Sequence, residues 1–336
     1  MTIKKQTNMT NKNYIRHFAA ILLGCLFCAQ AYAQQHTTEF VFRDTASPHV
    51  IERMQTNARA LFAEINSAHH QNRNLSLSLN NVTERARRNI NDMWGTSRFY
   101  STETRVVERV IRSAGGYQVR NIPVFFKDGA ALEDQYQDIV LEFAPDGRIS
   151  DVFIAIHQHQ FLQIMGNSTA VEDTRRRLIV VDFVENFRTA FNRRDIDFIE
   201  SVFSQDALII TGGRASQVQR SGDGLRLNSP QFDRHVRTTA QYIEGLRGVF
   251  ARNTHLNVRF DNIVVTRCEA RPNRYGVTLK QNWNSSTFNS EGWLFLLIDY
   301  EDENNPLIWV RTWQPLVDDF GMPTREEEIF GLGHFN

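Results

Sequence analysis

The sequence predicts an α+β protein of two domains, each with helices packed on a meandering antiparallel sheet. Apolar residues recur every three or four positions in some stretches, as in amphipathic helices, and alternate in others, as in half-buried strands. This order, with helices first and strands after, occurs twice along the chain. The length of 336 residues also favours two domains over one.

Residues 1–33 have the features of a secretory signal peptide. A basic stretch precedes the short apolar run FAAILLGCLFCAQAYA, which ends on the small residues Ala31 and Ala33. The run is shorter than the roughly 20 residues that span a bilayer. We therefore expect cleavage near Ala33 and a product in the periplasm or on the cell surface. Lipidation at Cys25 is the alternative, although Leu23 is bulky where lipoprotein signals have a small residue.

Removal of this leader would leave a mildly acidic chain. The sequence has 38 Lys and Arg and 38 Asp and Glu; the leader contains four of the basic residues and no acidic ones, which leaves 34 against 38. Proteins that bind nucleic acids are usually basic, so we expect no nucleic-acid partner. Cys268 is the cysteine that remains, which excludes an internal disulfide. After the leader, the sequence has no apolar run long enough to be a transmembrane segment.

The first half begins with an expected N-terminal linker, residues 34–47, followed by the first domain, residues 48–165. Helical spacing is present in VIERMQTNARALFAEI and continues in VTERARRNINDMW. The period then changes to two in RVVERVIRS, YQVRNIPVFF and QDIVLEFAPDGRISDVFIAIHQ. The sequence PDG in the last of these is typical of a hairpin turn.

A small polar linker, residues 166–173, precedes the second domain, residues 174–318, and residues 319–336 form a C-terminal tail. The stretch VVDFVENFRTAFNRRDIDFIESVFSQDALIITGG predicts two helices joined at a tight corner and then a strand. Asp195 is suited to cap the second helix, and Thr238 begins a capping box for a third. Four strands are expected to follow: LNVRFDNIVVTRCEA, YGVTLKQNWNSS, GWLFLLIDYE and LIWVRTWQPL.

Two stretches of the second half carry a resemblance to a known family. FVENFRTAFNRRDIDFIESVFSQDALII and YIEGLRGVFARN resemble the opening helices, the first strand and the third helix of the NTF2-like superfamily, which includes SnoaL-like and ketosteroid-isomerase-like proteins. The resemblance covers about residues 172–318, and the first half is a weaker match. YGVTLKQNW, EGWLFLLIDY and VRTWQP are similar to exported tandem proteins of Bacteroidetes-type bacteria. The resemblance to the NTF2-like superfamily implies two cones, in each of which helices and a curved sheet enclose a cavity. It implies no particular reaction.

Tryptophans on the last strands are the candidates for a ligand site. If residues alternate along the final strand, Trp309, Arg311 and Trp313 share one side and place a cation between two rings. Such a group can bind an apolar or anionic ligand by stacking and a charge-assisted hydrogen bond. The alternative is that the rings fill the core and Arg311 pairs with an acidic neighbour. The candidate ligand-binding residues are Trp283, Trp293, Arg311 and Trp313.

Two further residues are candidates for acid–base catalysis. In isomerase-type relatives the cavity holds a carboxylate base and hydrogen-bond donors, and no motif of this chain matches them. Asp299 has the strand parity of Trp293 and could face the cavity, but it also precedes the acidic turn YEDENN, which favours exposure to solvent. Tyr242 lies on the third expected helix. Asp206, at the start of a strand, suits a structural role. Asp299 and Tyr242 are therefore speculative acid–base groups.

Metal and cofactor sites are not expected. His157 and His159 have the spacing of two ligands on one face of a strand, but no third ligand is identifiable. The motifs of nucleotide-binding and hydrolytic enzymes are missing from the sequence. The arginine-rich segment of residues 212–237 is expected to be a loop near the cavity mouth, either a lid or a surface for an acidic partner.

These features leave three functional hypotheses. The first is an exported, non-catalytic protein whose second domain binds a small ligand or a protein partner. The second is a SnoaL-like isomerase, dehydratase or hydrolase that acts on a small apolar substrate. The third is an assembly module of a cell-envelope complex, or a homodimer, in which sheet faces pair between chains.

Overall fold

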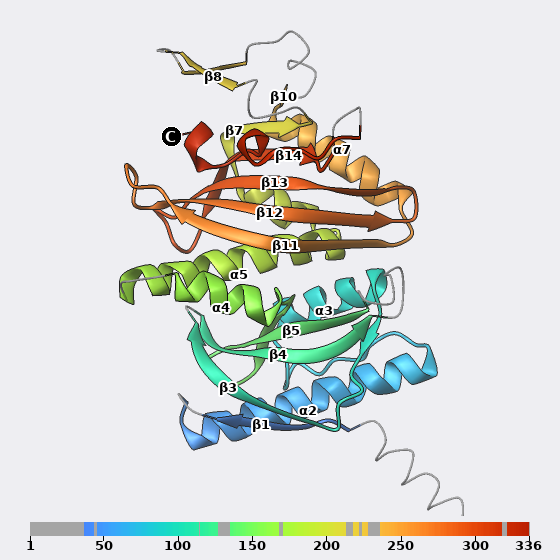
Figure 1. Ribbon diagram of the computed structural model, residues 1–336. Helices are drawn as coiled ribbons and strands as arrows, with labels where there is room; N and C mark the ends of the chain where they lie inside the picture. The colour runs from blue at the N-terminus through green and yellow to red at the C-terminus, as the bar shows by residue number, and fades with distance from the viewer. Residues whose placement is uncertain are drawn as a thin grey trace, which may run out of the picture.

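The computed structural model describes residues 37–43, 46–113, 115–126, 135–167, 171–212, 218–221, 224–227, 236–317 and 321–335. It contains two six-stranded sheets, one in each half of the chain, with helices α4 and α5 between them (Figure 1). The expected α+β class, with helices packed on a curved sheet in each half, is confirmed. The expected signal peptide lies outside the described residues.

The first half forms a mixed sheet, and helices pack on it through a shared apolar core. Its elements are β1 (Glu39–Arg43), α2 (Pro48–Gln71), α3 (Glu84–Thr96), β2 (Phe99–Tyr100), β3 (Arg105–Ser113), β4 (Gly116–Phe126), β5 (Tyr136–Phe143), β6 (Ile149–Ile154) and α4 (Gln158–Gly166). The strand order is β1-β3-β4-β5-β6, with β2 paired to β4. The β1–β3 pair is parallel and the others are antiparallel, so the sheet is not wholly antiparallel as expected.

Local sequence sets the limits of the first helices. α2 ends at the C-cap Asn72, which has a left-handed backbone with φ of 52°, a conformation that asparagine tolerates better than most residues. α3 begins after Thr83, whose hydroxyl accepts a hydrogen bond from the N–H of Ala86 at 3.2 Å. The apolar faces of both helices are buried in the first core, where Met54 and Phe62 are fully covered.

The expected linker at residues 34–47 contains a strand. β1 pairs with β3 at the edge of the sheet, and its side chains Phe40 and Phe42 are 1% and 4% exposed. Alternate residues of β1 therefore complete the first core. The strand has only five residues, too few for the alternation to be distinguished from chance in the sequence.

The second half repeats the arrangement with longer strands. Its elements are α5 (Val171–Arg193), α6 (Ile196–Ser201), β7 (Phe203–Thr211), β8 (Val218–Ser221), β9 (Gly224–Leu227), β10 (Val236–Arg237), α7 (Thr239–Arg252), β11 (Leu256–Arg267), β12 (Arg274–Ser285), β13 (Asn289–Asp299) and β14 (Leu307–Pro315). The strand order is β10-β7-β14-β13-β12-β11, with β8 and β9 in a separate pair. Much of the arginine-rich segment, at 213–217, 222–223 and 228–235, lies outside the described residues.

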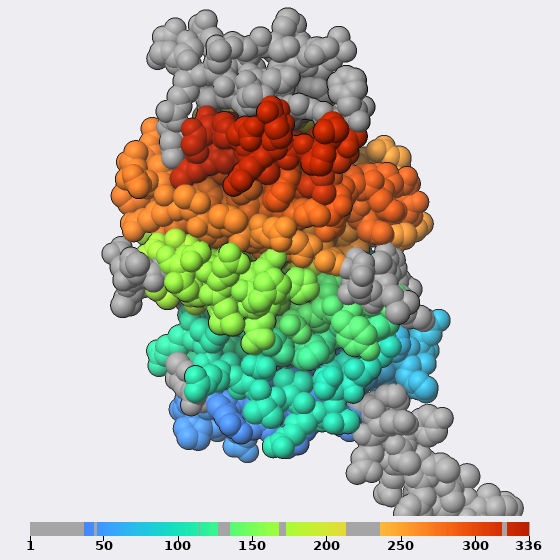
Figure 2. All heavy atoms as spheres, in the orientation of Figure 1, coloured from blue at the N-terminus to red at the C-terminus, as the bar shows by residue number. Residues whose placement is uncertain are grey.

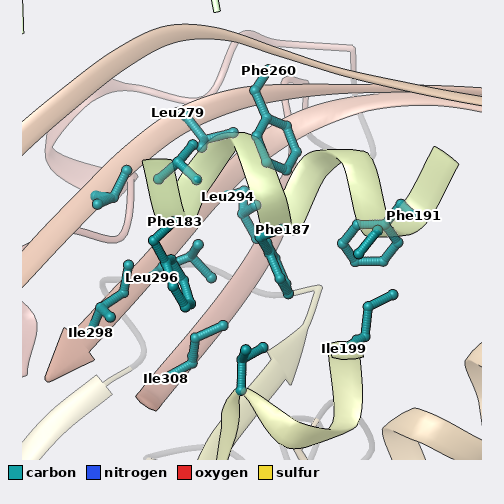
Figure 3. Packing of buried hydrophobic residues seen from close by; sticks show 14 of the residues in the cluster. Phe183, Phe187, Phe191, Ile199, Phe260, Leu279, Leu294, Leu296, Ile298 and Ile308 are labelled. Carbon is teal, nitrogen blue, oxygen red and sulfur yellow. The ribbon is translucent and has the colours of Figure 1, made fainter. Parts of the chain in front are cut away.

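Helix α5 forms one wall of the second core. Figure 3 shows Phe183, Phe187 and Phe191 pointing toward the strands, with Ile199 of α6 beside them. The strand side chains that meet them include Phe260, Leu279, Leu294, Leu296, Ile298 and Ile308. The apolar stripe expected in this helix is confirmed, as are the cap at Asp195 and the capping box that begins at Thr238. None of the described helices is both long enough and apolar enough to cross a membrane.

The other face of the second sheet is covered by the C-terminal residues. Phe295 and Leu297 of β13 alternate with the core residues of the same strand and form a separate apolar cluster with Phe330. Leu332 and Phe335 pack against this cluster. The segment expected to be a tail therefore covers part of the sheet face that does not meet the helices, over β7, β13 and β14. We call the face toward α5 and α7 the inner face and this second face the outer face.

Gly292 allows close approach of β14 to β13. A Cβ atom at this position would lie 2.4 Å from the carbonyl oxygen of Gln314 and 2.7 Å from Cε2 of Trp313. We expect Gly292→Ala to lower the free energy of unfolding by about 1–3 kcal/mol, the usual cost of overpacking, in urea denaturation. The matched control is Gly95→Ala in α3, where nothing lies within 4 Å of the new Cβ. Gly95→Ala should raise the free energy of unfolding by roughly 0.5–1 kcal/mol, because alanine favours a helix more than glycine does. If both variants changed the free energy of unfolding equally, the close approach of β14 to Gly292 would be contradicted.

Candidate functional site

Arg311 is a buried cation on the inner face of the second sheet. It pairs across the sheet with Leu296 on one side and Ile209 on the other, and both belong to the second core. Arg311 is 5% exposed, and its Cζ lies 4.7 Å from the ring centroid of Tyr242 on α7. Its Nε and Nη1 atoms are buried and have no hydrogen-bond partner among the described residues.

Such a guanidinium is unusual because burying a charge without partners costs several kcal/mol. Contact with the Tyr242 ring recovers about 1–2 kcal/mol of this cost. Burial raises the pKa of Tyr242, so its phenol stays protonated and able to donate a hydrogen bond. Arg311 therefore has two buried nitrogen atoms whose hydrogen-bonding capacity the described residues do not satisfy.

Trp283 and Trp313 share the inner face with Arg311. Trp313 is half-buried, and its ring lies over Gly292. Trp283 is 7% exposed and contacts the ring of Phe191 edge-on, with the ring centroids 5.8 Å apart. Its Nε1 has no hydrogen-bond partner within the described part of the chain. Gln281 pairs across the sheet with Gly292, and its Oε1 accepts no hydrogen bond from the residues that the structure describes. Unpaired polar atoms thus gather beside two indole rings.

Trp293 and Trp309 lie on the outer face, so the four tryptophans do not form one surface. Trp293 pairs with Gln314, whose side chain donates a hydrogen bond to the carbonyl of Glu328 in the C-terminal segment. A shift of register between Ile308 and Val310 turns Trp309 outward. There the Cζ of Arg274 lies 5.0 Å from its ring centroid. The prediction that Trp309 shares a face with Arg311 and Trp313 is wrong, because the irregularity in β14 falls at Trp309.

The inward orientation considered for Asp299 is wrong. Asp299 follows Phe295 and Leu297 on the outer face. Its Oδ2 accepts a hydrogen bond from Nε of Arg274 at 2.7 Å, and its Oδ1 accepts one from the N–H of Glu301 at 2.9 Å. The carboxylate therefore stabilises the end of the β13–β14 hairpin. Of the two residues considered for acid–base catalysis, only Tyr242 lies near Arg311.

His157 and His159 do not lie on a strand. β6 ends at Ile154, His157 is the N-cap residue of α4, and His159 is in the first turn of that helix. Their rings stack with centroids 5.8 Å apart. A polar His-Gln-His sequence fits a strand end and a helix start equally well. In the part of the chain that the structure describes, no group of three or more His, Cys, Asp or Glu could hold a metal ion. Cys268 is buried and forms no disulfide bond among the described residues.

A buried layer of charged side chains joins α5 to the first sheet, and sequence reasoning missed it. Arg120 of β4 is 4% exposed and forms a short ion pair with the fully buried Glu185 of α5. Farther along α5, Arg193 donates a hydrogen bond to Asp151 of β6 at 3.1 Å. Figure 2 shows the yellow-green surface of this region between the teal first half and the orange second half. Charged positions of an amphipathic helix usually face water, whereas here they face another domain.

Two carboxyl groups of this layer border a groove of about 1000 Å³ beside α5. Burial first and the charge of Glu185 second raise the pKa of Asp182 to about 8. Burial likewise raises the pKa of Glu142 to about 7, with the charge of Asp151 adding to the effect. Protons can therefore be exchanged here near neutral pH, as at many functional sites and some structural ones. This groove is not lined by Arg311 or the inner tryptophans.

Comparison with known proteins gives likeness of fold alone. No family model and no curated protein matches this chain. An NTF2-like protein from Cytophaga hutchinsonii has a TM-score of 0.31 at 12% identity, over 41% of this chain and 97% of its own. An NTF2-like protein from Pseudomonas putida has a TM-score of 0.31 at 8% identity, over 44% and 92%. ActVI-ORFA from Streptomyces coelicolor has a TM-score of 0.29 at 10% identity, over 41% and 95%.

Two of these proteins carry the name of the superfamily that the sequence resembles. At such identities and scores they support no inference about an activity.

Proposed function

We propose that this is an exported protein whose second cone binds a small molecule with an apolar body and an anionic group. The observation that carries the proposal is the guanidinium of Arg311, buried against Tyr242 with two nitrogen atoms unpartnered among the described residues. The leader-like residues 1–33 support export.

The residues around Arg311 suit the two parts of such a ligand. A carboxylate that accepts hydrogen bonds from Arg311 supplies the missing counter-charge, and charge-assisted bonds of this kind are strong when buried. The hydroxyl of Tyr242, which stays protonated, is a second candidate donor, carried by the ring that Arg311 contacts. Trp313 is half-buried, so a ligand that enters past it can keep an apolar ring against the indole. This combination favours an aromatic or alicyclic acid over a purely polar ion.

A matched pair of probes tests the charge dependence. We expect 1-naphthoate to bind with a measurable dissociation constant in isothermal titration calorimetry, and neutral 1-naphthalenemethanol to bind more weakly. Arg311→Met should weaken naphthoate binding about tenfold to a hundredfold, because one charge-assisted hydrogen bond contributes about 1.5–3 kcal/mol. The same change should leave the binding of the alcohol nearly unaltered.

The two faces of the sheet supply the control for position. Trp313→Ala should abolish naphthoate binding, whereas Trp293→Ala, on the outer face, should leave its affinity within about threefold of the unmodified protein. Unaltered affinity in Arg311→Met and Trp313→Ala would refute the placement of the ligand. If Trp293→Ala and Trp313→Ala lowered the affinity for naphthoate equally, the loss would reflect disturbed folding and not a lost contact with the ligand.

A further inference from the structure

A separate cleft of about 610 Å³ lies between the two halves of the chain. Its walls come from β5 and the β6–α4 connection of the first half, from α5, and from the outer face of β11, β12 and β13. Most lining side chains are polar or charged. The cleft is therefore unlike the inner face near Arg311, which is bordered by indole rings and the second core.

Arg188 of α5 lines this cleft and is 4% exposed. It donates from Nε to the carbonyl of Val258 at 2.9 Å, from Nη1 to the carbonyl of Ala155 at 3.1 Å, and from Nη2 to the side chain of Gln137. All three acceptors are neutral, and a guanidinium has five N–H donors, so two remain for another partner. Burial lowers the pKa of Arg188 to about 10, although the charges of Asp261 and Glu185 oppose this effect.

The other cations of the cleft have carboxylate partners. Arg259 pairs with Asp261 at 3.1 Å, and Lys280 forms a short ion pair with Glu291. Arg188 has no carboxylate within ion-pair distance among the described residues, because its three bonds hold it against backbone and amide oxygens. A buried cation of this kind is stabilised by an anion that reaches the two free donors.

Other side chains that line the cleft are also suited to bind a small polar anion. His157 and His159 stack at the start of α4 and line the cleft, and His157 lies 3.6 Å from Asp261. Each imidazole carries a ring N–H group, a further hydrogen-bond donor at the wall of the cleft. Asp138, a lining carboxyl, has a pKa raised by burial, so it gains a proton more readily than an exposed aspartate and can then donate a hydrogen bond.

We propose that the cleft between the halves binds a small polar anion, a carboxylate or a phosphate, with Arg188 as its principal donor. The volume is that of a site for a metabolite-sized molecule. The lining is polar, so the ligand differs in class from the apolar acid proposed for the second cone. Because α5, β5 and β11 all contribute, an occupant would contact both halves at once.

Calorimetry on the whole chain tests this site with three probes: inorganic phosphate, citrate, and the neutral polyol myo-inositol. Phosphate, citrate or both should bind saturably, and myo-inositol should not. Arg188→Gln should weaken anion binding at least tenfold. The matched control is Arg259→Gln, which removes a cation of the same cleft that already has a carboxylate partner. This control should change the affinity by less than about threefold.

Phosphate binding alone would identify an oxyanion site, and citrate binding alone a site for organic acids; either result supports the proposal. Absence of binding by both anions overturns it, and so does equal affinity in Arg188→Gln and the unmodified chain. If Arg188→Gln does not fold, the side-chain N–H resonances of Arg188 in the unmodified protein decide the question. Their shift on saturation with the anion supports the site, and unshifted resonances at saturation exclude it.

Discussion

Arg120→Met is expected to lower the free energy of unfolding by about 3–5 kcal/mol, the cost of removing one partner of a buried ion pair. Arg120 is 4% exposed and Glu185 is fully buried, and the two are in direct contact. Arg120 Nη1 also lies 3.6 Å from Asp182. Removal of the cation leaves the carboxylate of Glu185 buried without its counter-charge. Equilibrium unfolding in urea measures the loss.

Two further variants show whether the charge is the cause. Arg148→Met removes an ion pair with Asp146 that is about 40% exposed on both sides, and it should cost less than 1 kcal/mol. Adding Glu185→Gln to Arg120→Met should restore part of the stability, because the uncompensated charge is then removed as well. A loss below about 1 kcal/mol in Arg120→Met would contradict the account of the charged layer.

Raising the pH from 5 to 8 is expected to destabilise the folded chain through Asp182, by about 2–4 kcal/mol. Its pKa is about 8 in the folded state against 3.8 for an unperturbed aspartate, with burial as the first cause and the charge of Glu185 as the second. Because the folded pKa is raised, folding takes up a proton in this range. The contribution is complete below about pH 4 and is lost as the pH rises through 8.

The difference between the unmodified chain and Asp182→Asn isolates this effect from other titrating groups. Urea denaturation at pH 5, 6.5 and 8 should show a smaller fall in stability for the variant, because an amide does not titrate. Glu142, with a pKa raised to about 7, should leave a weaker residual dependence that Glu142→Gln removes. Parallel pH profiles of Asp182→Asn and the unmodified protein would show that Asp182 does not hold this proton.

The elements of this protein could largely be predicted from the sequence, whereas the surroundings of its charged residues could not. The spacing of Phe183, Phe187 and Phe191 is sufficient to predict α5 and its core face. The same pattern assigns Glu185 to the opposite face of the helix, but it does not show whether that face meets water or another domain. The contact with Arg120 depends on how the first sheet packs against α5, which is tertiary information.

The candidate ligand site shows the same limit. Alternation along the last strand predicts that Arg311 and Trp313 lie on the same face, and they do share the inner face with Trp283. Trp293 could not be placed correctly, because the face that each strand turns to the core depends on its register with its neighbours. Arg188 gave no signal in the sequence, since a single arginine on a helix carries no motif. Only the structure shows that Arg188 donates to Val258, Ala155 and Gln137, which are all neutral acceptors, and that two of its N–H groups remain for another partner.

The central claim, that the guanidinium of Arg311 binds the anionic group of a small ligand, is tested most directly by nuclear magnetic resonance of arginine side chains. The Nε–H resonances of Arg311 and Arg188 can be followed in one sample during a titration with 1-naphthoate. We expect the Arg311 resonance to shift saturably, with the midpoint found by calorimetry, while that of Arg188 stays in place. An unshifted Arg311 resonance at saturation would contradict the claim.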